Sequence, residues 1–136
     1  MRRLALLIIW IVAASFSAVA QDEFSIADFT KSPTEHIINR IDKPFVVRSV
    51  TGVVTSTGVR EPFRGVLFEL QGPGPDRTIR NAITDKNGQL KIKHIREGTY
   101  HFKATMNGWQ SVIGTITVSK KADKRSEIKI NMRLGV

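Results

Sequence analysis

Alternation of apolar and polar residues is the feature that most constrains the fold of this chain. In the stretch "GVLFELQ", Val66, Phe68 and Leu70 fall on one side of an extended chain. Glu69 falls on the other side. A period of two is that of a β-strand with one packed face and one solvated face. The same alternation recurs in "GQLKIKH" (88–94), "GTYHFKATM" (98–106), "SVIGTITVS" (111–119) and "SEIKINMRL" (126–134).

Glycine, proline and asparagine separate these stretches. The loop "GPGPD" (72–76) cannot lie in a central strand, because proline lacks the N–H that a sheet ladder needs. Two weaker runs, 45–57 and 77–84, complete a set of seven strands. Short alternating strands with frequent turns are typical of a sandwich. The sequence therefore predicts an all-β fold, a seven-stranded antiparallel β-sandwich over residues 45–136, in which Leu134 points inward.

The first twenty residues, "MRRLALLIIWIVAASFSAVA", have the pattern of an export signal. Arg2 and Arg3 precede an apolar run, and the small residues Ala18 and Ala20 suit a cleavage site. The apolar run is short for a transmembrane helix, which needs roughly 20 residues. We expect residues 1–20 to be a signal peptide and the mature protein to be periplasmic or extracellular, without an integral membrane segment.

Residues 21–44 lack the alternation and form an N-terminal extension. In "SPTE", Ser32 could cap a helix, Pro33 suits its first position, and Glu35 could close a capping box. The sequence leaves two alternatives open, a short helix over 33–41 or a tether that becomes ordered on contact with a partner.

Composition excludes several kinds of chemistry. The chain has no cysteine, which removes thiol catalysis, Cys-ligated zinc and disulfides. Its histidines, His36, His94 and His101, form no short zinc or hydrolase motif. We therefore expect no enzyme activity, no metal and no cofactor. The formal net charge is +9, and +7 once Arg2 and Arg3 are removed with the signal. Outside the cytoplasm this charge favours acidic glycans, lipid head groups or wall polymers over nucleic acid.

Two linked patterns carry a family resemblance. "TDKNGQLKI" (84–92) and "GTYHFKA" (98–104) follow "VTGVV" (50–54) and "EPFRGVLFELQG" (61–72) in a fixed order. This order resembles the carboxypeptidase regulatory-like domain, a transthyretin-like (prealbumin-like), immunoglobulin-like sandwich that is also grouped with carbohydrate-binding-like folds. The resemblance covers roughly residues 47–134. It implies a non-catalytic module.

The conspicuous residues of these patterns have structural explanations. Asp85 can bond its own backbone two residues on, and Asn87-Gly88 tolerate a tight turn. Gly98 permits a sharp bend before the next strand. Tyr100 and Phe102 are expected in the core, with the Tyr100 hydroxyl fixing a loop.

The candidate ligand residues are Trp109, Lys91, Lys93, His101 and Lys103. An exposed Trp109 could stack on a sugar ring, or it could cap the open end of the core. The other four occupy outward positions of their strands and could form a basic surface, although the sequence does not decide whether the two strands share a sheet.

These observations lead to two functional hypotheses. The first is a module that binds a glycan or another anionic polymer of the envelope. The second is an accessory domain that docks an envelope protein through an edge strand or through residues 21–44.

Overall fold

The computed structural model describes residues 26–58, 61–73 and 78–135. The predicted signal peptide, residues 1–20, lies outside the described residues. The described chain contains one short 3₁₀ helix and nine strands: η1 (Ile26–Asp28), β1 (Ile38–Arg40), β2 (Phe45–Val47), β3 (Val50–Ser56), β4 (Leu67–Gln71), β5 (Ile79–Ile83), β6 (Gln89–Ile92), β7 (Gly98–Thr105), β8 (Ser111–Val118) and β9 (Ile128–Met132).

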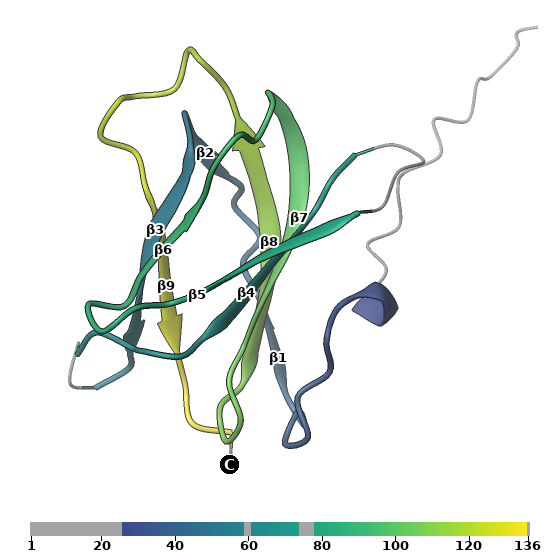
Figure 1. The fold of residues 1–136 in the computed structure, drawn as a ribbon. Coiled ribbons are helices and arrows are strands. Elements are labelled where there is room, and N and C mark those ends of the chain that lie inside the picture. The colour runs from purple at the N-terminus through teal and green to yellow at the C-terminus, as the bar shows by residue number, and fades with distance from the viewer. Residues whose placement is uncertain (1–25, 59–60, 74–77, 136) are drawn as a thin grey trace, which may run out of the picture.

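The strands form two sheets that pack face to face (Figure 1). Sheet A has six strands in the order β1-β8-β7-β4-β5, with β2 also paired to β8. Sheet B has three strands in the order β6-β3-β9. The predicted β-sandwich is confirmed, but the pairing is mixed. β1 and β2 run parallel to β8, and β3 runs parallel to β9, whereas the remaining pairs are antiparallel.

The first predicted strand, 45–57, is two strands in two different sheets. Phe45–Val47 pairs with β8 in sheet A, and Val50–Ser56 crosses to sheet B. The chain changes sheet at Arg48, whose Nε donates to the carbonyl of Ala122 at 2.5 Å. This short crossing ties the two sheets together at one end of the sandwich.

The core lies between the sheets and consists of the apolar residues that the alternation places inward. Phe102 is fully buried, stacks on Phe68 with ring centroids 5.4 Å apart, and contacts Phe45 from β2. Each inward residue of β4, β6 and β9 is buried. Leu134 is the exception, because β9 ends at Met132 and the Leu134 residue is 59% exposed. The prediction of an inward Leu134 is therefore wrong.

Residues 26–44 are called the N-terminal segment from here on. Its first part packs on the outer face of sheet A, and its strand β1 extends the edge of that sheet beside β8 (Figure 1). No helix forms over 33–41. Pro33 and Thr34 form a turn, closed by the Glu35 N–H donating to the Ser32 carbonyl at 3.1 Å. Strand β1 then pairs with β8, so the helix over 33–41, one of the two alternatives that the sequence left open, does not form. Pairing with the sheet edge prevails over the local capping signal, because a short isolated helix has little stability of its own.

Candidate functional site

The predicted basic surface is divided between the two outer faces of the sandwich. Lys91 lies on β6, and Lys93 directly follows it, so both belong to sheet B. His101 and Lys103 lie on β7 of sheet A. The two sheets face each other through their apolar sides, so outward residues of β6 and β7 point in opposite directions. The four residues therefore do not form one surface.

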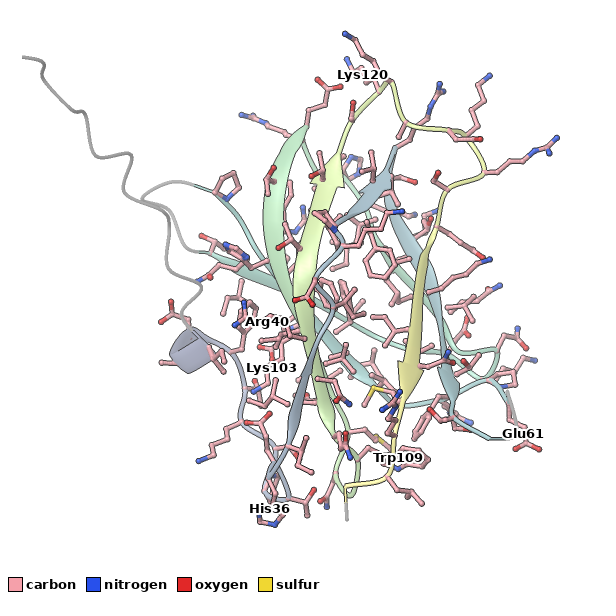
Figure 2. All side chains as sticks on the ribbon, turned by 180° about the vertical axis from the view of Figure 1, so that it is seen from behind. His36, Arg40, Glu61, Lys103, Trp109 and Lys120 are labelled. Atoms are coloured by element: carbon pink, nitrogen blue, oxygen red, sulfur yellow. The ribbon has the colours of Figure 1, made fainter. Side chains whose placement is uncertain are left out.

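Lys103 is buried, contrary to the expectation of an exposed ligand residue. Its side chain is 1% exposed, and its Nζ lies 2.7 Å from Oε1 of Glu35, whose side chain is 5% exposed. Glu35 belongs to the N-terminal segment, which covers this part of β7 (Figure 2). Lys103 thus holds that segment on sheet A, and the surface role predicted for it is wrong in this structure.

The surroundings of Glu35 favour its charged form. Burial opposes ionisation of the carboxyl, but the neighbouring Lys103 and Ser111 side chains and the positive charges of Lys103 and Lys31 outweigh it. The pKa of Glu35 is consequently lowered from its ordinary value of 4.5. Lys103 and Glu35 therefore form a true ion pair near neutral pH.

Other polar residues of sheet A are buried by the same segment. The Thr30 N–H and hydroxyl donate to Oε1 and Oε2 of Glu69 at 2.9 and 3.1 Å. The Gln71 side-chain amide donates to Oδ2 of Asp28 at 3.0 Å. His101 is half-buried and lines a small pocket of about 110 Å³ beside Arg40. This face of sheet A therefore makes specific polar contacts with the protein's own N-terminal segment.

Trp109 lies at the end of the sandwich where the β7–β8 turn meets the C-terminal residues. Its ring packs edge-on against Phe63, with centroids 4.5 Å apart, and contacts the core. Its backbone forms an isolated bridge with Leu134. Trp109 is thus half-buried between the two sheets. The sequence left the choice between a sugar platform and a core cap open, and this packing favours the cap.

The turn and core residues take the positions expected of them. Asp85 Oδ1 accepts the N–H groups of Asn87 and Gln89 at 2.8 and 3.0 Å. Gly88 has a φ of 68°, and an added Cβ would collide with the carbonyl oxygen of Val54. The Tyr100 hydroxyl donates to the Arg96 carbonyl at 2.6 Å, fixing the loop before β7.

Gly98, the first residue of β7, has a φ of 153°, a conformation that favours glycine. The chain bends there into the strand, as the sequence predicts.

A cluster of cations, of which only Lys93 was among the predicted site residues, gathers at the opposite end from Trp109 (Figure 2). This end, called the basic end, is built by the β2–β3 crossing, the start of β5, the β6–β7 connection (93–97) and the β8–β9 connection (119–127). Its exposed cationic side chains are Arg48, Arg80, Lys93, Arg96, Lys120, Lys121, Lys124 and Arg125. The acidic residues of the same connections are Glu97, Asp123 and Glu127.

Sheet register brings these connections together. The last residue of β2 is opposite the last residue of β8, and Gly98 at the start of β7 is opposite the same Val118. Ile92 at the end of β6 is opposite Val50 at the start of β3. The connections that carry the cations therefore meet at one end. In the sequence, the runs "KHIRE" (93–97) and "SKKADKR" (119–125) were the available signal of this basic end, because each begins where a predicted strand ends.

Hydrogen bonds to the backbone hold parts of the basic end in place. Arg80 donates from Nη2 to the Lys93 carbonyl at 2.7 Å and from Nη1 to the His94 carbonyl at 3.2 Å. Glu97 Oε1 accepts the Lys120 N–H at 2.7 Å. The two long connections are thus joined to each other and to β5. His94 has a φ of 61°, uncommon for a residue other than glycine.

A pocket of about 430 Å³ opens at the basic end between the β6–β7 connection and the residues Gly72, Pro73 and Thr78. Its walls combine an apolar part with charged groups. Leu70, Ile95 and Tyr100 supply apolar atoms. Arg80, His94, Arg96 and Glu97 supply the charged or titratable groups. Ligand pockets commonly have a size of about 300–1,000 Å³ and a few well-placed polar groups. The pocket is therefore large enough for a small ligand group.

Two absences hold for the described ranges of the chain. Within them, no group of three or more His, Cys, Asp or Glu side chains could hold a metal ion. In the same part of the chain, no helix is long and apolar enough to cross a membrane.

Comparison with known families identifies the family of this β-sandwich. Residues 45–132 match the family model of BOS complex subunit NOMO1-like, second beta sandwich domain. The match spans more than half of the chain, so the chain belongs to this family. It is therefore a β-sandwich domain, and the narrower resemblance to the carboxypeptidase regulatory-like domain stays a prediction.

One solved structure that resembles the chain is that of the pilus adhesin RrgA from Streptococcus pneumoniae. The likeness has a TM-score of 0.45 and 15% sequence identity and covers 65% of this chain. The chain spans about 15% of the length of that adhesin. No curated protein matches the chain significantly.

Proposed function

We propose that this chain is a non-catalytic binding module that recognises an anionic polymer through its basic end. The observation that carries the proposal is the gathering of eight exposed cationic side chains, against three acidic ones, on the start of β5 and the connections that meet with it at one end. Such an excess of one sign creates a local potential that attracts a polyanion and is weakened by salt. The matched family, a β-sandwich domain, is compatible with a non-catalytic role.

The first twenty residues support an extracytoplasmic setting for this binding. Their basic start, apolar run and small residues have the pattern of an export signal. In that setting the anionic polymers are acidic glycans, wall polymers and lipid head groups. The basic end would attach the module to one of them.

Charge reversal tests which surface binds. We expect the double variant Lys121→Glu/Lys124→Glu to elute from a dextran sulfate column at lower salt than the unmodified chain. The matched control is Lys91→Glu/Lys129→Glu, which changes the net charge equally on the exposed outer face of sheet B. The control should elute at higher salt than the basic-end variant. If the two variants elute at the same reduced salt concentration, only net charge matters. That result would contradict a site at the basic end.

A second candidate function is an accessory role in a protein assembly. The matched family is named for a complex subunit, and the edge strand β5 carries Ile83 with 66% of its surface exposed. Residues 26–44 already bond to sheet A, so β5 is the better docking element. A partner recovered with the unmodified chain and lost with Ile83→Lys would support this role. Retention of that partner by the variant would count against docking through β5.

A further inference from the structure

The pocket at the basic end offers a ligand two kinds of polar partner. Arg80 and Arg96 line it as hydrogen-bond donors with a permanent positive charge. Glu97 lines it as an acceptor. A ligand that fills this pocket must therefore bring both anionic oxygens and hydrogen-bond donors of its own.

The geometry of Arg80 leaves its guanidinium able to bind an anion. Two of its nitrogens donate to the carbonyls of Lys93 and His94. A guanidinium carries more N–H donors than these two bonds use, and it pairs well with planar carboxylates. Because the backbone carbonyls fix its orientation, little side-chain entropy is lost when an anion binds.

Glu97 distinguishes between classes of polyanion. Its Oε1 accepts the Lys120 N–H at 2.7 Å, and a carboxylate can accept several hydrogen bonds. A chain of phosphates has only acceptor oxygens near neutral pH and would be repelled by this carboxylate. Sugar hydroxyl groups can donate to it. The pocket therefore suits a ligand with hydroxyls beside its acidic group.

The apolar wall of the pocket also favours a sugar over a nucleic acid base. Leu70, Ile95 and Tyr100 line it, and the Tyr100 residue is only 8% exposed. Among the described residues that line the pocket, no exposed phenyl, phenol or indole ring could serve as the platform on which nucleic acid bases commonly stack. The aliphatic ring carbons of a sugar can pack against this partly buried apolar wall.

We propose that this pocket binds one acidic sugar residue of an anionic glycan, with the sugar carboxylate at Arg80 and Arg96 and its hydroxyls toward Glu97. This inference rests on the proposed function, because the pocket is part of the basic end. It adds the ligand class: the surrounding lysines attract any polyanion, whereas the pocket selects a uronate.

Calorimetric titration of the full chain with three probes tests the inference. The probes are a short oligogalacturonate, the same oligomer with its carboxyls reduced to alcohols, and a polyphosphate of similar charge. We expect the oligogalacturonate to bind and the reduced oligomer not to bind. Arg96→Ala should weaken oligogalacturonate binding about tenfold, the change for one lost hydrogen bond to a charged group. It should weaken polyphosphate binding much less.

Arg96→Ala preserves the backbone carbonyl that accepts the Tyr100 hydroxyl, so the loop should keep its fold. Arg80→Gln is a second variant with the same expectation. Lys124→Ala is the matched control outside the pocket and should weaken the two anionic probes alike.

The outcomes separate this inference from the proposed function. If the reduced oligomer binds as tightly as the oligogalacturonate, the uronate site is overturned. It is also overturned if Arg96→Ala weakens the binding of oligogalacturonate and of polyphosphate equally. Binding of polyphosphate without oligogalacturonate would overturn it too, while the polyanion function would stand. If neither anionic probe binds at low salt, both proposals fail.

Discussion

The two outer faces of the sandwich carry similar polar residues in opposite surroundings. Lys91 on β6 and Lys103 on β7 both occupy outward positions of alternating strands. Lys91 is exposed, because nothing in the described chain covers the outer face of sheet B there. Lys103 is buried under the N-terminal segment and paired with Glu35. The difference shows that an outward position specifies a side of the sheet and does not specify contact with solvent.

The largest effect is expected where the covered face loses one partner of its ion pair. Lys103→Met leaves the Glu35 carboxylate buried without its counter-ion, which should lower the free energy of unfolding by about 3–5 kcal/mol. Urea denaturation measures the change. The double variant Lys103→Met/Glu35→Leu removes both charges and should recover much of the loss. A single variant as stable as the unmodified chain would mean that the pair is not buried in solution.

Acid should weaken the same pair reversibly. The folded pKa of Glu35 is lowered, so the unfolded chain binds a proton at this group more readily than the folded chain. The stability from Glu35 is therefore complete above the ordinary value of 4.5 and is lost as the pH falls through the lower folded pKa.

Urea unfolding between neutral pH and pH values below 4.5 measures this loss. The double variant Lys103→Met/Glu35→Leu, which lacks the pair, should lose less stability over the same range. Identical profiles of stability against pH for the two proteins would contradict the attribution of the acid sensitivity to the Glu35–Lys103 pair.

A smaller effect compares two threonines on the two faces. Thr30→Val removes the hydroxyl that donates to the Glu69 carboxylate at 3.1 Å, at a cost of about 1 kcal/mol. Thr55→Val on sheet B removes a hydroxyl that donates to Asn131 in an exposed position, where the change should stay within about ±0.5 kcal/mol. Thermal unfolding of the two variants gives the comparison. A larger loss of stability in Thr55→Val than in Thr30→Val would show that the N-terminal segment adds little to stability.

The smallest effect is expected at Lys91. Lys91→Met changes an exposed side chain on the uncovered face, so the free energy of unfolding should change by no more than about 0.5 kcal/mol. Urea denaturation beside Lys103→Met provides the direct contrast. A loss as large as that of Lys103→Met would reveal a cover on sheet B that the described residues do not include.

Local sequence signals were sufficient for much of the fold. Inward positions such as Phe68 and Phe102 follow from the period of two, which holds wherever a strand has one apolar face. The Asp85 turn and the Tyr100 hydroxyl bond were also predicted, because both involve partners within four residues. Such short-range geometry depends on residue type and spacing alone.

Predictions that needed distant partners were less successful. In one of the two alternatives for residues 21–44, Glu35 closed a capping box at the start of a helix, but its partner is Lys103 on strand β7. Leu134 continued an inward pattern after β9 had already ended. The basic end was missed, because its cations lie on separate connections that only the strand register brings together.

The sequence by itself determined the class of fold, most of the strands and most of the core residues, since each of these depends on local periodicity and turn chemistry. The tertiary structure alone decided which outward face is covered and where the cations meet. The physical reason is that burial depends on what packs against a residue. The segment that buries Lys103 lies far from it along the chain and is held over it by the pairing of β1 with β8 and by the bonds of Thr30 and Asp28 to sheet A.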